Sequence, residues 1–239
     1  MPNPTAAMLV IGDEILSGRT HDSNTHHLAG VLTAAGIDLQ EARVARDEEG
    51  AIIAAVQALS AQYDYVFTSG GIGPTHDDIT ADAIARAMGR CIDVRADARA
   101  ILAAHYERSG TELNEARLRM ARIPDGARLI DNPVSAAPGF IVGNVHVMAG
   151  VPSIFKAMVA SLIPTLTGGA PLLSRSMDVY RGEGDVAAPL AELAARFPQL
   201  AFGSYPFQRN GAYGTNLVAR GQDAAELDTA LAAMVESFG

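Results

Sequence analysis

The residues of this chain that could carry chemistry gather in one short segment, TSGGIGPTHDDIT, at positions 68–80. The backbone N–H groups of a glycine-rich segment can close around phosphate oxygens, and the glycines here are Gly70, Gly71 and Gly73. Two adjacent carboxylates, Asp77 and Asp78, follow, and the segment contains no lysine. It is therefore not a Walker A loop, which needs Lys-Ser/Thr after its last glycine. The segment predicts a phosphate-binding loop whose carboxylates are neutralised by a divalent cation.

Two further carboxylates follow other strand-like segments. Asp13 comes directly after the apolar run AAMLVIG, and Asp47 comes shortly after IDLQEARV. The carboxyl ends of parallel strands share one edge of a sheet, and ligands bind at that edge. Taken singly, Asp13 suits a turn and Asp47 suits a helix N-cap, while the two adjacent aspartates could cap a helix ahead of Thr80. Their expected convergence beside a glycine loop favours a binding site.

We therefore predict a site for one or two divalent cations, Mg²⁺, Mn²⁺ or Co²⁺. The predicted catalytic residues, which are also the predicted metal ligands, are Asp13, Asp47 and Asp78. The residues expected to bind phosphate or nucleotide around them are Gly12, Ser69, Gly70, Gly71, Gly73, Thr75 and Asp77. A cation held there would polarise a phosphoryl oxygen or activate a water molecule.

An alternation of strand-like and helix-like segments positions these residues. Strands are predicted at 6–12, 37–44 and 64–69, and helices at 22–36, 47–62 and 80–88. This order predicts right-handed crossovers and a mainly parallel sheet with helices on both faces. Residues 97–122 have the pattern of two helices broken near Gly110, and ARLI, GFIV and VHVM that of three short strands in the far part of the sheet.

The sequence changes character after TGGAP at 167–171. The segments that follow have the pattern of strand, helix, strand, strand and helix, which is typical of a small α+β unit. We therefore predict two domains, 1–170 and 171–239.

Composition narrows the choice of partners. The net charge of −9 over 239 residues argues against nucleic acid or an anionic membrane as a partner. No apolar run reaches the roughly 20 residues needed to span a bilayer. The single cysteine, Cys91, excludes an intrachain disulfide and fits a reducing compartment. We expect a cytoplasmic protein that acts on a small molecule.

Four motifs in a fixed order carry a resemblance to a known family. They are IGDEILSG with DSN, then GGIGPTHDDIT, then NPVSAAPGF, then GVPSIFKAM, across residues 10–158. This set resembles the N-terminal domain of competence/damage-inducible protein A (CinA), within the molybdopterin-binding fold shared with MoaB, MogA and a domain of MoeA. Downstream, GEGDVAAPL and GSYPF are similar to the segment that follows this domain in eukaryotic FAD synthases. The resemblance implies a three-layer α/β/α sandwich, often oligomeric, that binds molybdopterin or a nucleotide.

The resemblance also implies residue roles. Asp13, Asp47 and Asp78 match aspartates of the family's motifs, and Lys156, the only lysine of this chain, keeps the family's lysine. Lys156 is therefore a predicted phosphate contact. Two residues of NPVSAAPGF are expected to close the opposite wall of the site, Ser135 and Gly139.

Three departures from the family pattern bear on function. Ala149 stands where the family has a proline, and Ile154 stands where it has a glutamate that could contact metal or ribose. The sequence also stops at Gly239, before the amidase domain of full-length CinA, so nicotinamide-mononucleotide deamidation is not expected.

CinA-type domains are associated with metal-dependent cleavage of ADP-ribose, and the related FAD synthase domain with FAD hydrolysis. We expect a metal-dependent hydrolase of such nucleotide pyrophosphates, and a homo-oligomer. One alternative is molybdopterin binding or adenylyl transfer, although Asp77 stands where the adenylyltransferases usually carry arginine. A second alternative is a module that binds a nucleotide or pterin without catalysis.

Overall fold

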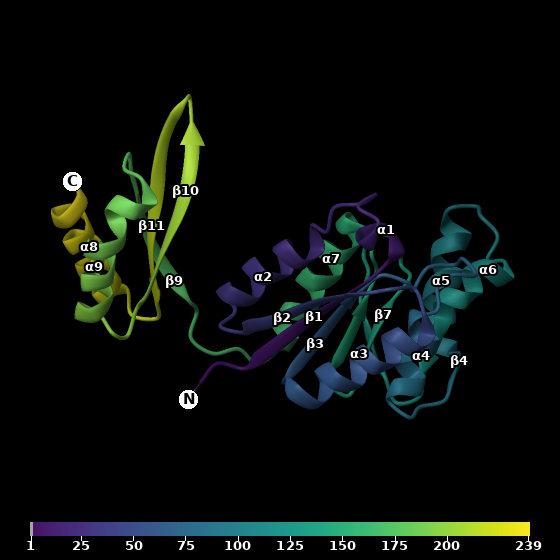
Figure 1. Ribbon diagram of the computed structural model, residues 1–239. Helices are drawn as coiled ribbons and strands as arrows, with labels where there is room; N and C mark the ends of the chain where they lie inside the picture. Colours follow the sequence, from purple (N-terminus) through teal and green to yellow (C-terminus); the bar gives the residue numbers. More distant parts are fainter. Residues whose placement is uncertain (1) are drawn as a thin grey trace. The chain divides into compact units, whose positions relative to one another are not determined.

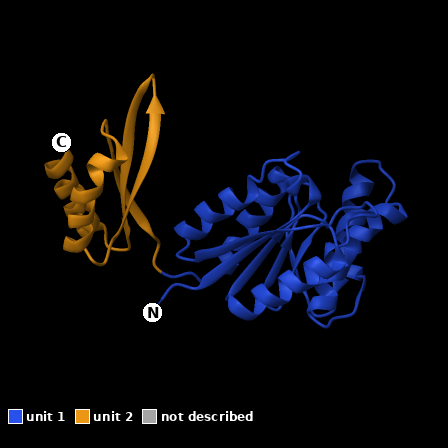
Figure 2. Ribbon diagram, viewed as in Figure 1, with its two compact units in different colours: residues 1–169 blue, residues 170–239 orange. Residues whose placement is uncertain are grey.

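The computed structural model describes residues 2–239 and divides the chain at residue 169. One unit is Met1–Gly169 and the other is Ala170–Gly239, and each has a hydrophobic core of its own (Figures 1 and 2). The sequence analysis placed this boundary at residue 170.

Unit 1 is built on a six-stranded sheet of order β2-β1-β3-β8-β7-β6. The strands, in that order, are Asp38–Ala45, Thr5–Ile11, Tyr65–Ser69, Val145–Met148, Gly139–Val142 and Arg128–Ile130. The first four strands pair in parallel, and β7 pairs antiparallel with both of its neighbours. The α/β fold with a mainly parallel sheet is confirmed, with β7 as the strand that reverses direction.

Helices cover both faces of this sheet (Figure 1). One core cluster contains α3 Glu49–Gln62, α4 Thr80–Ala87 and α5 Ala96–Arg108, and the other contains α2 Asn24–Ala34 and α7 Pro152–Leu162. Shorter elements complete the unit: α1 Asp13–Leu16, α6 Glu115–Leu118, and the 3-10 turns Arg119–Ala121 and Ile163–Thr165. A two-stranded antiparallel pair, β4 Ile92–Val94 with β5 Arg122–Pro124, was not expected from the sequence.

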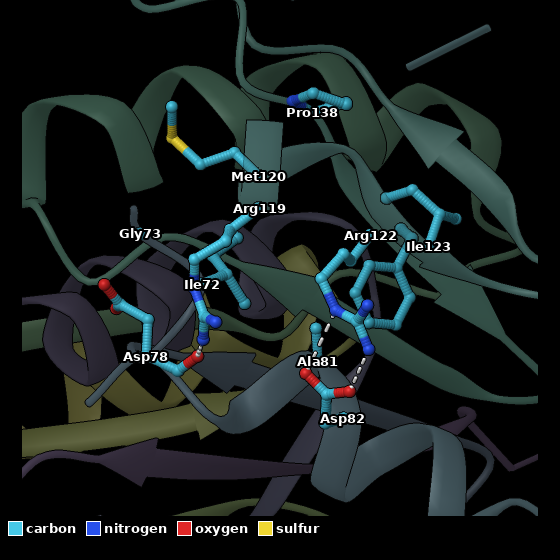
Figure 3. A pocket seen from close by; sticks show the side chains of 11 residues that line it. Ile72, Gly73, Asp78, Ala81, Asp82, Arg119, Met120, Arg122, Ile123 and Pro138 are labelled. Atoms are coloured by element: carbon cyan, nitrogen blue, oxygen red, sulfur yellow. Dashed lines mark hydrogen bonds and ion pairs between the residues drawn. The ribbon is translucent and has the colours of Figure 1, made fainter. Parts of the chain in front are cut away.

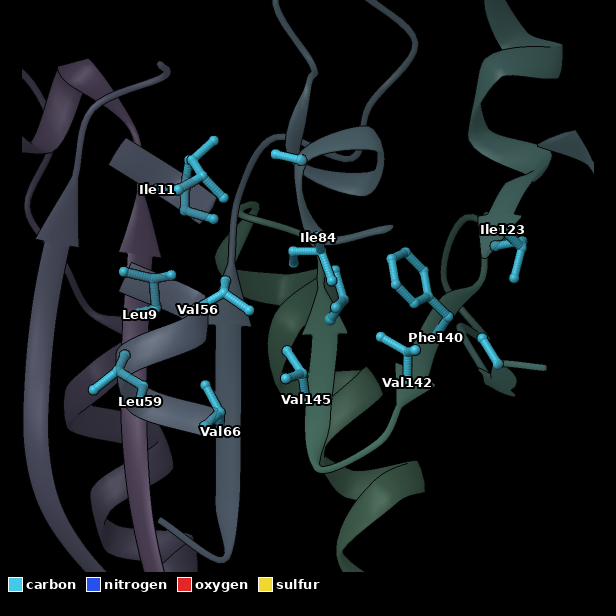
Figure 4. Close-up of a cluster of buried hydrophobic side chains, with 14 of the residues drawn as sticks. Leu9, Ile11, Val56, Leu59, Val66, Ile84, Ile123, Phe140, Val142 and Val145 are labelled. Atoms are coloured by element: carbon cyan, nitrogen blue, oxygen red, sulfur yellow. The ribbon is translucent and has the colours of Figure 1, made fainter. Parts of the chain in front are cut away.

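The apolar strand β1 contributes side chains to the hydrophobic cores on both faces of the sheet. Leu9 and Ile11 belong to the cluster that includes α3 and α4 (Figure 4), whereas Met8 and Val10 belong to the cluster that includes α2 and α7. A strand covered on both faces has to be apolar throughout, which explains the unbroken run in the sequence. The edge strand β2 instead alternates exposed and half-buried residues.

The helix cap suggested at Asp47 does not form. Helix α3 begins at Glu49, so Asp47 lies outside it, and the Asp47 carboxylate accepts a hydrogen bond from the backbone N–H of Asp13 at 2.9 Å. Thr80 is the first residue of α4, and its hydroxyl is buried without a hydrogen-bond partner. Its backbone N–H donates to the carbonyl of Gly71 at 3.0 Å, so α4 is tied to the glycine loop.

Unit 2 has the expected order of strand, helix, strand, strand and helix. Its elements are β9 Leu173–Val179, α8 Glu183–Arg196, β10 Ala201–Arg209, β11 Ala212–Gly221 and α9 Ala224–Phe238. The three strands form an antiparallel sheet of order β10-β11-β9, and its core includes residues of both helices. The hairpin between β10 and β11 turns at Asn210 and Gly211, both with positive φ, as a two-residue hairpin turn requires.

Within residues 2–239, no helix combines the length and the apolar character needed to cross a membrane.

Candidate functional site

An open cleft of about 560 Å³ lies at the carboxyl ends of the parallel strands of unit 1. This volume is within the range of small-molecule sites, and this edge of an α/β sheet is where ligands bind. Four segments supply most of the lining: the turn after β1, the glycine loop after β3, the loop 132–137 and the start of α7.

The glycine loop approaches its neighbours too closely for side chains. Gly70 has φ 114°, and a Cβ there would lie 2.1 Å from the carbonyl oxygen of Ile11. Gly71 has φ 66°, and a Cβ there would lie 2.0 Å from the hydroxyl of Thr80. Both glycines line the cleft, as predicted, and leave its floor to backbone atoms. A bare backbone of this kind is what close approach to a phosphate group requires.

The second half of the loop is closed by Asp78. The Asp78 carboxylate accepts hydrogen bonds from the backbone N–H of Thr75 at 2.8 Å and from the Thr75 hydroxyl. A Cβ on Gly73 would lie 2.6 Å from the same carboxylate, so a larger residue there would displace the Asp78 side chain. Asp77, Asp78 and Gly73 line the cleft, but Thr75 does not. Thr75 donates to Asp78 from outside the lining of the cleft, and its contact with a phosphate stays a prediction.

Asp47 reaches the cleft from the loop after β2. Burial raises the pKa of its carboxyl group above the usual range, and the negative charges of Glu14, Asp13 and Asp77 raise that pKa further, whereas the hydrogen bond from the Asp13 N–H opposes them. Carboxylates from three separate segments therefore lie close enough together to act on Asp47, although burial is the larger cause of its raised pKa.

The predicted set of three metal ligands is not formed. Among residues 2–239, no three His, Cys, Asp or Glu side chains are grouped so that they could enclose a metal ion. Asp13 does not line the cleft, and its carboxylate accepts a hydrogen bond from the Arg46 guanidinium at 3.3 Å. The remaining donors still fit a cation shared with a ligand, since Mg²⁺ at nucleotide sites usually takes one or two carboxylates plus phosphate oxygens. Asp47, Asp77 and Asp78 supply such carboxylates along the cleft wall.

The opposite wall is a rigid loop organised by Asn132. The buried Asn132 side chain accepts from the backbone N–H groups of Val134 and Ser135, both at 3.1 Å. It also donates to the Ser135 hydroxyl at 2.7 Å and to the Ala137 carbonyl at 2.8 Å. Asn132 and Ser135 both line the cleft, so Ser135 lies where the sequence placed it.

Gly139 does not form part of this wall. It is buried at the start of β7, where a Cβ would lie 2.2 Å from the carbonyl oxygen of Val147 and 2.4 Å from the Met158 side chain. The prediction for Gly139 is corrected: this glycine allows the sheet and α7 to pack closely.

Gly12 and Ser69 support the cleft from behind. Gly12 is buried, and its N–H donates to the Ala45 carbonyl at 3.2 Å, which joins the end of β1 to the end of β2. Ser69 is buried and accepts a hydrogen bond from the Asn24 side chain at 2.8 Å, while the same amide donates to the Gly150 carbonyl at 2.8 Å. Neither predicted phosphate contact lines the cleft.

Lys156 is also placed differently from the prediction. It is exposed on α7 and does not line the cleft. Its charge acts on His27 of α2, whose pKa is lowered first by burial and then by Lys156. The structure therefore gives no support to Lys156 as a phosphate contact.

A small hollow next to the cleft contains two arginines that are already engaged (Figure 3). Arg119 donates to the backbone carbonyl of Asp78 at 3.3 Å, and Arg122 forms an ion pair with Asp82 of α4. Both guanidinium groups line the hollow and not the cleft itself. They brace the glycine loop and the start of α4.

Sequence reasoning missed two charged residues that line the cleft, Glu14 and Arg19. Both lie in or beside the quoted motif IGDEILSG, yet only its aspartate was singled out. Ile154, noted from the sequence as a departure, lines the cleft together with Val151 and makes that part of the wall apolar.

Comparison with known proteins establishes the family. Residues 7–168 match the family described as "Probable molybdopterin binding domain", and residues 171–239 match "FAD synthase, middle domain". The chain belongs to the molybdopterin binding domain family, as the motifs indicated.

Individual relatives match different shares of this chain. A CinA-like protein of Desulfosudis oleivorans is 34% identical over 83% of this chain and 51% of its own length. A protein named "Probable FAD synthase" of Caenorhabditis briggsae is 31% identical over 97% of this chain and 49% of its own length. This chain thus spans about half the length of these curated relatives.

Among solved structures, the CinA protein of Thermoplasma acidophilum, described as being of unknown function, has a TM-score of 0.62 at 33% sequence identity. The likeness covers 68% of this chain and 97% of that one.

Proposed function

We propose that the cleft hydrolyses the pyrophosphate bond of a nucleotide such as ADP-ribose or FAD, with Mg²⁺, Mn²⁺ or Co²⁺. The observation that carries this proposal is that a bare glycine backbone and four carboxylates, those of Glu14, Asp47, Asp77 and Asp78, line the same cleft. Backbone N–H groups favour a phosphate there, whereas the carboxylates oppose it. A divalent cation shared by phosphate and carboxylate oxygens reconciles the two.

Each residue has a defined part in the proposed reaction. Gly70, Gly71 and Gly73 offer backbone to the phosphate oxygens, and Asp78 keeps the loop closed through Thr75. A divalent cation held by Asp47, Asp77 and Asp78 together with the ligand would stabilise charge on the phosphoryl group and lower the pKa of a water molecule. Water oxygen bonds to one phosphorus, the bridging P–O bond breaks, and the two phosphate products leave. In this proposal Asp47, whose raised pKa makes it a stronger base than an ordinary carboxylate, accepts the proton of that water.

Two observations favour a flavin nucleotide within this class. The likeness to a probable FAD synthase runs through both units of the chain. The start of α7 also gives the cleft an apolar wall, with Val151 and Ile154, against which a planar ring can pack.

The family description supports a second candidate, the binding of a pterin phosphate such as molybdopterin in the same cleft. In this case the glycine loop holds the single phosphate, and the apolar wall packs against the pterin ring. Adenylyl transfer to that pterin is the catalytic form of this candidate.

A ligand panel tests these proposals at the level of binding. Thermal shift and calorimetry are run with FAD, ADP-ribose and a pterin phosphate, each in Mg²⁺ and in EDTA. The pyrophosphatase proposal expects FAD or ADP-ribose to raise Tm with Mg²⁺ and to lose most affinity in EDTA. Tight binding that is the same in EDTA contradicts the role of the cation, and binding of the pterin alone favours the second candidate.

A further inference from the structure

We propose that Arg19 binds the second anionic group of the ligand, the one that the glycine loop does not hold, and so makes the cleft prefer a pyrophosphate to a single phosphate. This inference rests on the proposed function only in requiring an anionic ligand in the cleft.

The charges that line the cleft single out this residue. Four carboxylates line it, Glu14, Asp47, Asp77 and Asp78, and Arg19 is the one basic side chain among the described residues that do so. A divalent cation bound at these carboxylates would offset part of this negative charge. A ligand with two phosphates brings further negative charge, and a fixed positive group is needed next to it.

The arginines near the cleft are otherwise occupied. Arg46 pairs with Asp13, and Arg122 pairs with Asp82. Arg119 donates through one terminal nitrogen to the Asp78 carbonyl; its Nε has no hydrogen-bond partner within residues 2–239, but that atom is buried and Arg119 does not line the cleft. In the part of the chain that the structure describes, the Arg19 side chain makes no hydrogen bond or ion pair with another residue. Its donors are therefore available to a ligand without breaking an existing contact.

The backbone delivers Arg19 to the cleft wall through a tight turn. Gly18 has φ 74°, and its N–H donates to the Ile15 carbonyl at 3.1 Å. The N–H of Thr20 donates back to the Glu14 carbonyl at 3.0 Å, so the chain folds onto α1. Arg19 and Thr20 consequently line the cleft from the segment after β1, whereas the glycine loop follows β3.

The chemistry of the guanidinium group suits this place. Arginine stays charged at every physiological pH and offers a planar fork of donors that matches two phosphate oxygens. The glycine loop and Arg19 belong to two different segments, so one phosphate can lie on each. A ligand with a single phosphate contacts only the glycine loop.

The test compares Arg19→Gln and Arg19→Lys with a matched control, Arg90→Gln. Arg90 is exposed, makes no side-chain bond with another described residue and does not line the cleft. Binding of inorganic pyrophosphate, ADP-ribose and inorganic phosphate is measured by calorimetry in Mg²⁺, with Tm as the check on folding.

Arg19→Gln is expected to weaken pyrophosphate and ADP-ribose by about 10- to 100-fold, the loss of a charge-assisted contact. Inorganic phosphate binding should change little, Arg19→Lys should recover part of the loss, and Arg90→Gln should match the wild type. The proposal is overturned if Arg19→Gln binds pyrophosphate as the wild type does, or if it loses phosphate and pyrophosphate equally. It is also overturned if the wild type binds none of the three probes.

The readout separates this proposal from the proposed function. If the wild type binds ADP-ribose through Arg19 but never releases AMP, hydrolysis fails and the Arg19 assignment stands. If the wild type releases AMP and Arg19→Gln binds and reacts normally, the Arg19 assignment fails and the hydrolase stands.

Discussion

Asp47 is held with a raised pKa by its half-buried position and by the acidic groups around it. The folded chain therefore binds the Asp47 proton more tightly than the unfolded chain does. As the pH rises through the window between the two pKa values, the unfolded chain loses its proton first, and the free energy of unfolding falls. In the absence of a cation, the charge of Asp47 at neutral pH destabilises the fold.

Asp47→Asn is consequently expected to raise Tm at pH 7 in EDTA. The asparagine oxygen can still accept the hydrogen bond from the Asp13 N–H, while the charge is gone. The gain should shrink as the pH approaches about 4, the ordinary pKa of a carboxyl group. A scan of Tm against pH for the two proteins checks this, and an equal or lower Tm for the variant at pH 7 contradicts it.

At the scale of residues, the sequence predicted which loops reach the cleft better than it predicted which way individual side chains point. Asp47, Asp78 and Ser135 lie in the cleft because they follow strand ends or a loop whose place the fold dictates. Lys156 was chosen because it is the only lysine, but residue type alone does not say which way a helix presents a side chain. Arg19 was overlooked because nothing in its type separates it from the other arginines of the chain.

At the scale of elements, the central strands could be predicted because both of their faces are buried. The short strands and the helix caps could not, because they depend on contacts between segments. The unbroken apolar run of β1 predicted a strand between two helical layers, and the structure has that arrangement. The pair β4–β5 could not be predicted, because strands of three residues carry too little periodicity. The cap suggested at Asp47 does not form, and the Asp47 carboxylate instead accepts a hydrogen bond from the backbone N–H of Asp13.

The glycine loop gives a prediction at this scale. Gly70→Ala meets both a positive φ and the Ile11 carbonyl, and is expected to cost about 2 kcal/mol or more of unfolding free energy. Gly30→Ala, in the exposed interior of α2 with open space at its Cβ, should instead stabilise by about 0.5–1 kcal/mol.

Urea unfolding of the two variants measures both effects. Equal stabilities would show that the close approach of Gly70 to β1 does not constrain the loop.

At the scale of the whole molecule, the change of pattern near residue 170 marks a real boundary between two cores. Every residue that lines the cleft belongs to unit 1, between Ile11 and Ile154. A chain of residues 1–169 is therefore expected to fold and to bind the nucleotide with the affinity of the full chain. Calorimetric titration of both proteins tests this, and a large loss of affinity in the shorter chain would mean that unit 2 takes part in binding.

Assembly into a homo-oligomer stays a prediction, which light scattering can test.

The central claim is that the carboxylates of the cleft and a divalent cation together cleave a nucleotide pyrophosphate. AMP release from FAD and from ADP-ribose, followed with Mg²⁺, Mn²⁺, Co²⁺ or EDTA, tests it most directly when wild type and Asp78→Asn are compared. The asparagine oxygen can still accept from Thr75, so Tm should be kept, while the loss of the charge should lower turnover by orders of magnitude. The account predicts metal-dependent AMP release by the wild type that is abolished in EDTA and nearly lost in the variant. Absence of AMP release with every metal, or undiminished release by Asp78→Asn, would contradict it.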